Sequence, residues 1–313
     1  LLSNQRHFAL ELQEEGIPVL YLLSSQTYAE VVQHVHQQTG PLHAFAHAER
    51  SLRVEMSPAI EQGCVVMHDH PGWVTQRSWF VESVGVEPPF RMDAFYRTVR
   101  QKTGWLMVEG KPVVGKYSFD AENRRPWKGE PEAPPAPFFG RDAVDEEVEA
   151  LVRSRFADHP GRVDLSSQPT SRGDLDAALA FARDALPHFG PFEDAMSERS
   201  RGLFHSRLAT VVNLHRLMPG EAVAMALDSP APLNSVEGFV RQMIWREYVH
   251  HIHDVTDGFR TLDVHRQAAV REARWSTADD GELHPNHLRQ HHALPDAYWG
   301  KTSGLQCLDA SVA

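Results

Sequence analysis

The sequence predicts an α/β domain followed by an all-α domain. Short apolar runs alternate with amphipathic helical patterns in the first third of the chain, and beyond residue 141 only helical periodicity remains. A segment rich in proline and glycine separates the two regions. We therefore expect a partial α/β domain over residues 1–115, a surface linker over residues 116–140 and a helical domain over residues 141–313.

The α/β part is expected to contain a mostly parallel, Rossmann-like sheet. Its first helix places Leu1, Phe8 and Leu12 on one side, and the second is capped by Ser24 or Ser25. No GxGxxG fingerprint follows a predicted strand, so a dinucleotide site of that kind is absent. The predicted helices are residues 1–15, 25–38 and 49–63, and the predicted strands are Ile17–Leu23, 42–48 and 64–69.

Helical patterns dominate the remainder of the chain. Residues 88–104 form an amphipathic pattern with proline at its start and glycine at its end. Further helices are predicted over residues 142–156, 171–190 and 235–258. Ser171, with Asp174 three residues later, is typical of a helix N-terminus.

Composition limits the classes of protein that fit the chain. The net charge of −11 gives no general attraction to nucleic acid, and no apolar run is long enough to span a membrane. Two distant cysteines and the absence of a signal-peptide pattern predict a cytoplasmic protein without a disulfide framework. The chain starts at Leu1 and ends within a helical pattern, so we expect a fragment of a longer protein.

The segment around Ser206 is the first candidate binding site. Ser206 precedes a predicted helical run over residues 208–217, and several arginines lie close to it in sequence. A helix start with free backbone N–H groups favours an anion such as phosphate. The alternative is an ordinary helix cap surrounded by surface arginines, and the local sequence leaves both open.

The helix over residues 235–258 offers a second candidate. Phe239, Gln242 and Arg246 share one face, and together they suit a flat, polar, partly anionic ligand. The alternative is that Arg246 and Glu247 belong to structural salt bridges. Both remain open at this level.

Histidines form two groups, which raises the question of a metal. His250 and Asp254 have a workable two-ligand spacing, yet no cysteine pair or HExxH pattern supports zinc. We interpret these histidines as solvated or capping residues. Local sequence alone indicates that Cys307 is a small packing residue. The groups are His250, His251 and His253, and His284, His287, His291 and His292.

Several segments together resemble a known family. They are "QKTGWLMVEGKPVVGKYSFDAENRRP", "LPHFGPFEDAMSERSRGLFHSRLA", "PLNSVEGFVRQMIWREYVHHIHDVTDGFR" and "AYWGKTSGLQC". In order and content they resemble the iron–sulfur branch of the cryptochrome/photolyase family, the prokaryotic (6-4) photolyase-like flavoproteins. The "FDAENR" and "WREY" blocks are the most specific parts of this resemblance.

The resemblance implies an α/β antenna domain and an incomplete helical domain that binds FAD. Ala209 stands where the family's "HSxLS" turn has its second serine, so one hydroxyl contact is lost. Trp245 matches a tryptophan that related enzymes present to the damaged base. The residues expected to contact FAD are His205, Ser206, Arg207, Leu208, Ala209, Phe239, Gln242 and Arg246.

Further cofactors follow from the same resemblance. Cys307 matches the first of four cysteine ligands of a [4Fe–4S] cluster, and Trp299 matches a tryptophan assigned to electron transfer. An antenna chromophore is a third expected cofactor. Because three thiolates would have to come from outside this chain, the cluster is expected only in the full-length protein.

The resemblance implies a photolyase-type lyase that acts on UV-damaged DNA as a monomer. Excited, reduced FAD would transfer an electron to a pyrimidine dimer, with (6-4) photoproducts as the expected lesion; the fragment alone is expected to be inactive. The alternative is a cryptochrome-like blue-light receptor without repair activity. A third class, a metal-binding or scaffold protein that uses the histidines, would contain no flavin.

Overall fold

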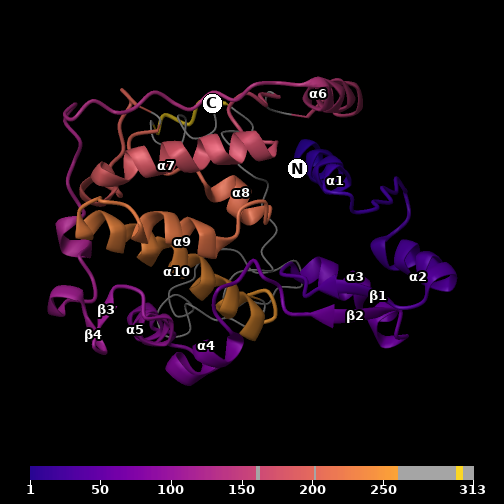
Figure 1. The fold of residues 1–313 in the computed structure, drawn as a ribbon, viewed down its shortest axis with the longest axis horizontal. Coiled ribbons are helices and arrows are strands. Elements are labelled where there is room, and N and C mark those ends of the chain that lie inside the picture. The colour runs from indigo at the N-terminus through magenta and orange to yellow at the C-terminus, as the bar shows by residue number, and fades with distance from the viewer. Residues whose placement is uncertain (160–162, 201, 260–300, 306–313) are drawn as a thin grey trace. The chain divides into compact units, whose positions relative to one another are not determined.

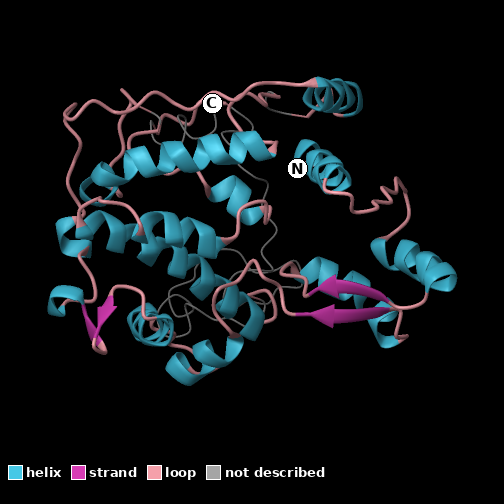
Figure 2. Cartoon of the chain, in the orientation of Figure 1, coloured by secondary structure: helices cyan, strands magenta, loops and turns pink. Residues whose placement is uncertain are grey.

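The computed structural model describes residues 1–159, 163–200, 202–259 and 301–305, and helices predominate among them (Figure 1). The strands are short (Figure 2). In chain order the elements are α1 Leu2–Glu14, α2 Tyr28–Thr39, β1 Leu42–Phe45, α3 Arg50–Glu61, β2 Val65–His68, α4 Arg77–Val84, α5 Met92–Thr103, β3 Met107–Val108, β4 Lys111–Pro112, two 3₁₀ turns at Val113–Gly115 and Asp120–Glu122, α6 Ala143–Arg155, α7 Arg172–Phe192, α8 Ala209–Asn213, α9 Pro219–Leu227 and α10 Leu233–Val255.

The chain forms two compact units. The larger comprises residues 1–148 and 164–258, and the smaller comprises residues 149–163 and 259–313. In the smaller unit the structure describes the second half of α6, where Arg153 and Glu149 form an ion pair at 2.6 Å. Residues 301–305 of this unit are exposed. The sites below all lie in the larger unit.

A small parallel sheet forms the centre of the α/β part. β1 pairs with β2 in a register that joins Leu42 to Val65 and Phe45 to His68. α2 and α3 pack against these strands in one apolar cluster, and its buried members are Ala29, Met56, Ala59, Cys64 and Val65. Parallel pairing requires a crossover, and α3 provides it. The predicted α/β arrangement with parallel strands is therefore present as a two-stranded sheet.

The prediction of a strand over Ile17–Leu23 is wrong. These residues form an extended loop between α1 and α2, and Leu20 and Leu23 are 75% and 81% exposed. Among the described residues, β1 pairs only with β2, so no strand edge receives this segment. An apolar run becomes a buried strand only when a neighbouring strand and a covering layer are available to it.

Two details of the first helices also differ from expectation. The predicted apolar side of α1 is not buried, because Phe8 is 47% exposed while the polar residues Ser3, Asn4 and His7 face inward. In α2 the cap is Thr27 and not Ser24 or Ser25; Thr27 and Glu30 form a complete capping box. The side-chain hydrogen bonds of Thr27 thus override the weaker signal of the preceding serines.

α4 and α5 pack against α9 and α10 around a second apolar cluster. Its buried members are Phe80, Phe95, Tyr96, Val99, Val223, Val240, Ile244 and Tyr248. Buried Arg100 donates hydrogen bonds to the carbonyls of Trp105 and Tyr117 at 3.1 and 2.7 Å, which fixes the chain after α5. Helix α5 agrees with the pattern predicted over residues 88–104.

The segment predicted as a linker follows the surface but is anchored at two points. Asn123 is fully buried and donates to the carbonyl of Asn234 at 3.0 Å, and Phe139 is part of the helical core. Apart from one 3₁₀ turn, residues 116–140 contain no helix or strand. The boundaries at residues 115 and 141 remain predictions.

The helical core is built chiefly by α7, α9 and α10. α7 begins with the predicted capping box of Ser171 and Asp174, which is confirmed. Gly190 allows α7 and α10 to approach closely, since a Cβ at this position would lie 2.8 Å from the Cα of Ser235. The Gly190 amide donates to the Ser235 hydroxyl at 2.9 Å across this contact. In the part of the chain that the structure describes, no helix combines the length and apolar character required to cross a membrane.

Candidate functional site

A cavity of about 600 Å³ lies between α7, α10 and the loop before α8. This volume is in the usual range for a small-molecule or cofactor site. All eight residues predicted to contact a cofactor line it, namely His205, Ser206, Arg207, Leu208, Ala209, Phe239, Gln242 and Arg246. The structure therefore brings together two segments that are more than 30 residues apart in sequence.

The loop over residues 202–208 places Arg207 at the centre of this region. Arg207 adopts a left-handed backbone with φ of +58°, which is unusual for a residue with a side chain. Gly202 gives its guanidinium room, because a Cβ there would lie 2.3 Å from Nη2 of Arg207. Arg207 also lines two further cavities of about 190 and 360 Å³.

The predicted helix after Ser206 is shorter than expected. The predicted run over residues 208–217 contains only the five-residue α8 and a turn at His215, whose φ is +53°. The Ser206 hydroxyl accepts a long hydrogen bond of 3.5 Å from the Leu208 amide, and Leu208 precedes the helix. A five-residue helix has little macrodipole, so any anion here would depend mainly on Arg207 and single backbone amides.

Phe239 and Gln242 present different chemistry to the cavity. Phe239 is 3% exposed and contacts Phe189 edge to face, with ring centroids 5.8 Å apart. Gln242 is exposed and forms no hydrogen bond with the described part of the chain. α10 thus presents an apolar ring and one amide that can both donate and accept hydrogen bonds.

Arg246 lines the cavity, but its guanidinium already has protein partners. It donates to the Gly72 carbonyl at 3.0 Å and to Oδ1 of Asn213 at 3.2 Å, and it lies over the Trp73 ring at 4.0 Å. Burial lowers the pKa of Arg246 from its usual value, whereas the neighbouring Glu247 carboxylate raises it by a smaller amount. The salt-bridge interpretation of Arg246 therefore describes part of its role, and contact with a ligand remains a prediction.

Glu247 anchors α10 to the loop after β2. Its carboxylate is buried and accepts hydrogen bonds from the amides of Val74 and Thr75, both at 3.0 Å, and from the Thr75 hydroxyl at 2.9 Å. Burial raises the pKa of Glu247, although these bonds and Arg246 favour the ionised form. The "WREY" block is thus largely a structural joint.

Glu193 is a lining residue that the sequence interpretation missed. It pairs with the guanidinium of Arg241 at 2.5 Å, and Arg241 also lies 3.4 Å from Glu237. Burial raises the pKa of Glu193 and opposes the effect of Arg241. Glu193 lies in the quoted "FGPFEDAMSERS" stretch, but no spacing rule connects it to α10. Asn213, Phe189 and Met243 line the cavity as well and carried no sequence signal.

Two histidines of α10, His250 and His251, pack against other side chains and differ from the sequence interpretation, whereas His253 is half-buried. His250 stacks on Trp73 with ring centroids 3.6 Å apart, and burial lowers its pKa to about 3. His251 is 3% exposed, its Nε2 lies 2.8 Å from the Thr75 hydroxyl, and burial lowers its pKa to about 4. Because α10 packs against the loop after β2, these side chains become part of the joint.

Of the remaining predicted site residues, the structure describes only Trp245. Trp245 is 38% exposed, does not line the cavity and contacts Tyr248 edge to face at 5.3 Å. Trp299, Cys307 and the histidines from His284 to His292 lie outside the described residues. Their predicted roles therefore stay predictions.

Comparison with known proteins defines the class. Residues 1–167 match the family described as "Deoxyribodipyrimidine photo-lyase-related protein", and the chain belongs to that family. The chain is also 29% identical over 323 aligned positions to a "(6-4) photolyase" of Agrobacterium fabrum (strain C58 / ATCC 33970). That alignment covers 98% of this chain and 59% of the relative, so the chain spans about three fifths of the relative's length.

Proposed function

We propose that this chain carries the FAD-binding wall of a light-dependent flavoprotein that repairs UV-induced pyrimidine dimers, with (6-4) photoproducts as its substrate. The proposal is supported by membership in the photolyase-related family and by similarity to a (6-4) photolyase. The observation that carries it is the single cavity lined by all eight predicted FAD-contacting residues.

The shape of the region fits an elongated dinucleotide. Arg207 lines the 600 Å³ cavity and also the two smaller ones, so this one residue borders all three. An arginine in such a position suits a diphosphate, because its planar fork can bond two oxygens at once. The ring system and the adenosine would then occupy separate compartments.

The proposed roles follow from the side chains. Arg207 and nearby backbone amides hold the diphosphate; Phe239 supports a flat ring, and Gln242 hydrogen-bonds to its polar edge. Arg246 stabilises the wall by joining α10 to Gly72 and Asn213. When bound and reduced, FAD supplies the light-driven electron that splits the lesion. The chain's own residues hold the cofactor and limit the access of water to it.

A second cavity is our candidate for the antenna chromophore. It has a volume of about 840 Å³ and lies beside the C-terminal end of β2, where ligands of parallel sheets commonly bind. His70, Trp73 and His250 give it aromatic walls. Its neighbour α10 also carries the FAD wall, which suits energy transfer between two chromophores.

Trp245 and Cys307 are the residues proposed to contact DNA and to bind the iron–sulfur cluster. Trp245 is exposed and available to contact an extruded base. With a net charge of −11, the protein needs a local basic rim to hold the damaged strand. Cys307 would ligate a [4Fe–4S] cluster, whereas Cys64 packs in the apolar cluster of α2, α3 and β2. The iron and acid-labile sulfide contents of the wild type and of Cys307→Ser, measured in the full-length protein, test the proposed cluster.

Repair is tested with the protein expressed from the complete reading frame that contains these residues. Oligonucleotides with one (6-4) photoproduct or one cyclobutane dimer are illuminated with the reduced protein and kept in parallel in the dark. We expect light-dependent loss of the (6-4) lesion and no loss in the dark.

Two results would overturn the proposal. Flavin photoreduction with unchanged lesions of both kinds would favour a blue-light receptor without repair activity. Protein without flavin that contains bound metal would favour the metal-binding or scaffold class.

A further inference from the structure

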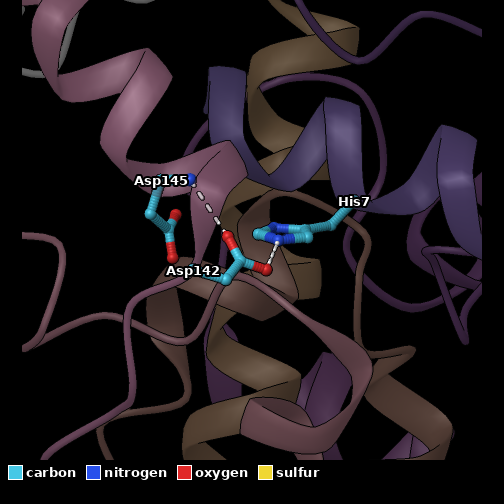
Figure 3. A group of neighbouring side chains, drawn as sticks. All are labelled: His7, Asp142 and Asp145. Carbon is cyan, nitrogen blue, oxygen red and sulfur yellow. Dashed lines mark hydrogen bonds and ion pairs between the residues drawn. The ribbon is translucent and has the colours of Figure 1, made fainter.

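Three potential metal ligands converge where α1 meets the start of α6. His7 comes from α1, Asp142 immediately precedes α6, and Asp145 lies in its first turn (Figure 3). One ligand atom from each side chain lies within 4.8 Å of the other two. The closest pair is Nε2 of His7 and Oδ2 of Asp142, at 2.8 Å.

Two of these side chains are buried and incompletely bonded. Asp145 is 1% exposed; its Oδ2 accepts from the Thr170 hydroxyl at 3.1 Å, whereas its Oδ1 has no hydrogen-bond partner in the described structure. His7 is 6% exposed, and its Nδ1 likewise has no partner there. A buried carboxylate oxygen without a partner is costly, so its retention calls for an explanation.

An ordinary structural role explains only part of the cluster. Asp142 accepts hydrogen bonds from the amides of Val144 and Asp145 at 2.9 and 3.1 Å, as expected of a residue that caps α6. Its hydrogen bond with His7 ties α1 to this cap. Neither interaction provides a partner for Oδ1 of Asp145. The neighbouring cation, Arg6, lies 3.0 Å from Glu147.

We propose that His7, Asp142 and Asp145 bind a divalent transition-metal cation. An imidazole nitrogen with two carboxylate oxygens is a donor set used for zinc and manganese, and three protein ligands leave positions for water. The cation replaces the hydrogen bond between His7 and Asp142 and gives Oδ1 of Asp145 its partner. Such an ion clamps α1 onto the start of α6, and it is independent of flavin binding.

The test is a titration of metal-free protein with Mn²⁺, followed by electron paramagnetic resonance and by the midpoint of thermal unfolding. We expect one bound Mn²⁺ per chain at this site, a rise in the unfolding midpoint and nitrogen coupling from one imidazole. Zn²⁺ should displace Mn²⁺, because divalent zinc binds such donors more tightly. Asp145→Asn and His7→Gln should each weaken Mn²⁺ binding at least tenfold.

Matched controls separate this site from other histidines and acids. His43 and His68 approach to 2.7 Å and offer two imidazoles, so His43→Gln tests binding at that pair. Asp176→Asn removes an exposed carboxylate of α7. Both control variants should bind Mn²⁺ as the wild type does.

Equal affinity in wild type, Asp145→Asn and His7→Gln would overturn the proposal, as would the absence of Mn²⁺ and Zn²⁺ binding. Either result would leave the cluster as a hydrogen-bonded cap of α6. If a ligand variant fails to fold, the nitrogen coupling in the wild-type spectrum and its loss in the other variant decide the question.

Discussion

Glu247 and Thr75, although 172 residues apart, form two hydrogen bonds, one from the Thr75 amide at 3.0 Å and one from its hydroxyl at 2.9 Å. The same carboxylate accepts from the Val74 amide, and Thr75 also contacts His251. One buried acid therefore joins α10, which lines the cavity, to the loop that follows β2. We expect the position of α10 beside the cavity to depend on this joint.

Removal of the Glu247 carboxylate should destabilise the protein strongly. Glu247→Ala leaves the buried amide and hydroxyl of Thr75 and the half-buried amide of Val74 without an acceptor, which we expect to lower the free energy of unfolding by about 3 kcal/mol. Glu247→Gln keeps an acceptor oxygen and should cost about 1 kcal/mol. Urea unfolding followed by circular dichroism measures both values.

Glu61→Ala is the control, since Glu61 is exposed at the end of α3. Its effect should stay within about 0.5 kcal/mol. A loss for Glu247→Ala no larger than for this control would show that the joint is unimportant for stability.

The buried histidine of this joint should make stability depend on pH. Burial lowers the pKa of His251 from 6.5 to about 4, so the unfolded chain binds a proton in a range where the native protein does not. Stability is then fully present above about pH 6.5 and falls as the pH decreases towards 4. At pH 5 the loss from this residue should reach at most about 2 kcal/mol.

Urea unfolding at pH 7, 6 and 5 measures this slope. His251→Gln should reduce it, because His250 still contributes in the same direction, and His34→Gln, which alters an exposed histidine of α2, should leave it unchanged. An identical slope in wild type and His251→Gln would refute the role of this residue.

Two glycines of α7 should respond in opposite directions to alanine. Gly190→Ala places a Cβ 2.8 Å from the backbone of Ser235, so α7 and α10 must separate, at a cost of about 1–3 kcal/mol. At Gly173 nothing lies within 4 Å of the added Cβ, and Gly173→Ala should stabilise the helix by up to about 1 kcal/mol. The midpoints of thermal unfolding of the two variants provide the comparison, and equal shifts in the midpoint would contradict the close contact between α7 and α10.

Gln242 should influence flavin binding without a change in stability. It is exposed and forms no hydrogen bond with the described residues, so Gln242→Leu removes only what it offers to a ligand. We expect weaker FAD binding by about five- to tenfold, in line with one lost hydrogen bond, and an unchanged unfolding midpoint. Fluorescence titration with FAD checks the first result and thermal unfolding the second. Unchanged affinity would remove Gln242 from the site.

Helical periodicity was sufficient to predict the shared face of α10. Phe239, Gln242 and Arg246 were placed together by a spacing of 3.6 residues per turn, and the structure does line one cavity with all three. The capping box of Ser171 was visible for the same reason, because its residues lie within one turn. Local geometry depends on local sequence, so both features could be predicted.

Features set by distant partners could not be predicted in this way. Ile17–Leu23 has the composition of a strand, but no strand is available for it to pair with in the described structure. The bonds of Arg246 to Gly72 and the pairing of Glu193 with Arg241 depend on tertiary packing. The metal candidate likewise joins His7 to residues more than 130 positions away.

The central claim, that the cavity around Arg207 holds FAD, is tested most directly by the flavin content of purified protein from the complete reading frame. Wild type and Arg183→Gln, which alters an exposed arginine of α7, should each carry about one FAD per chain. Arg207→Gln should bind FAD at least tenfold more weakly, because a charge-assisted bond to phosphate is lost. Equal flavin content in all three proteins, or none in the wild type, would contradict the account.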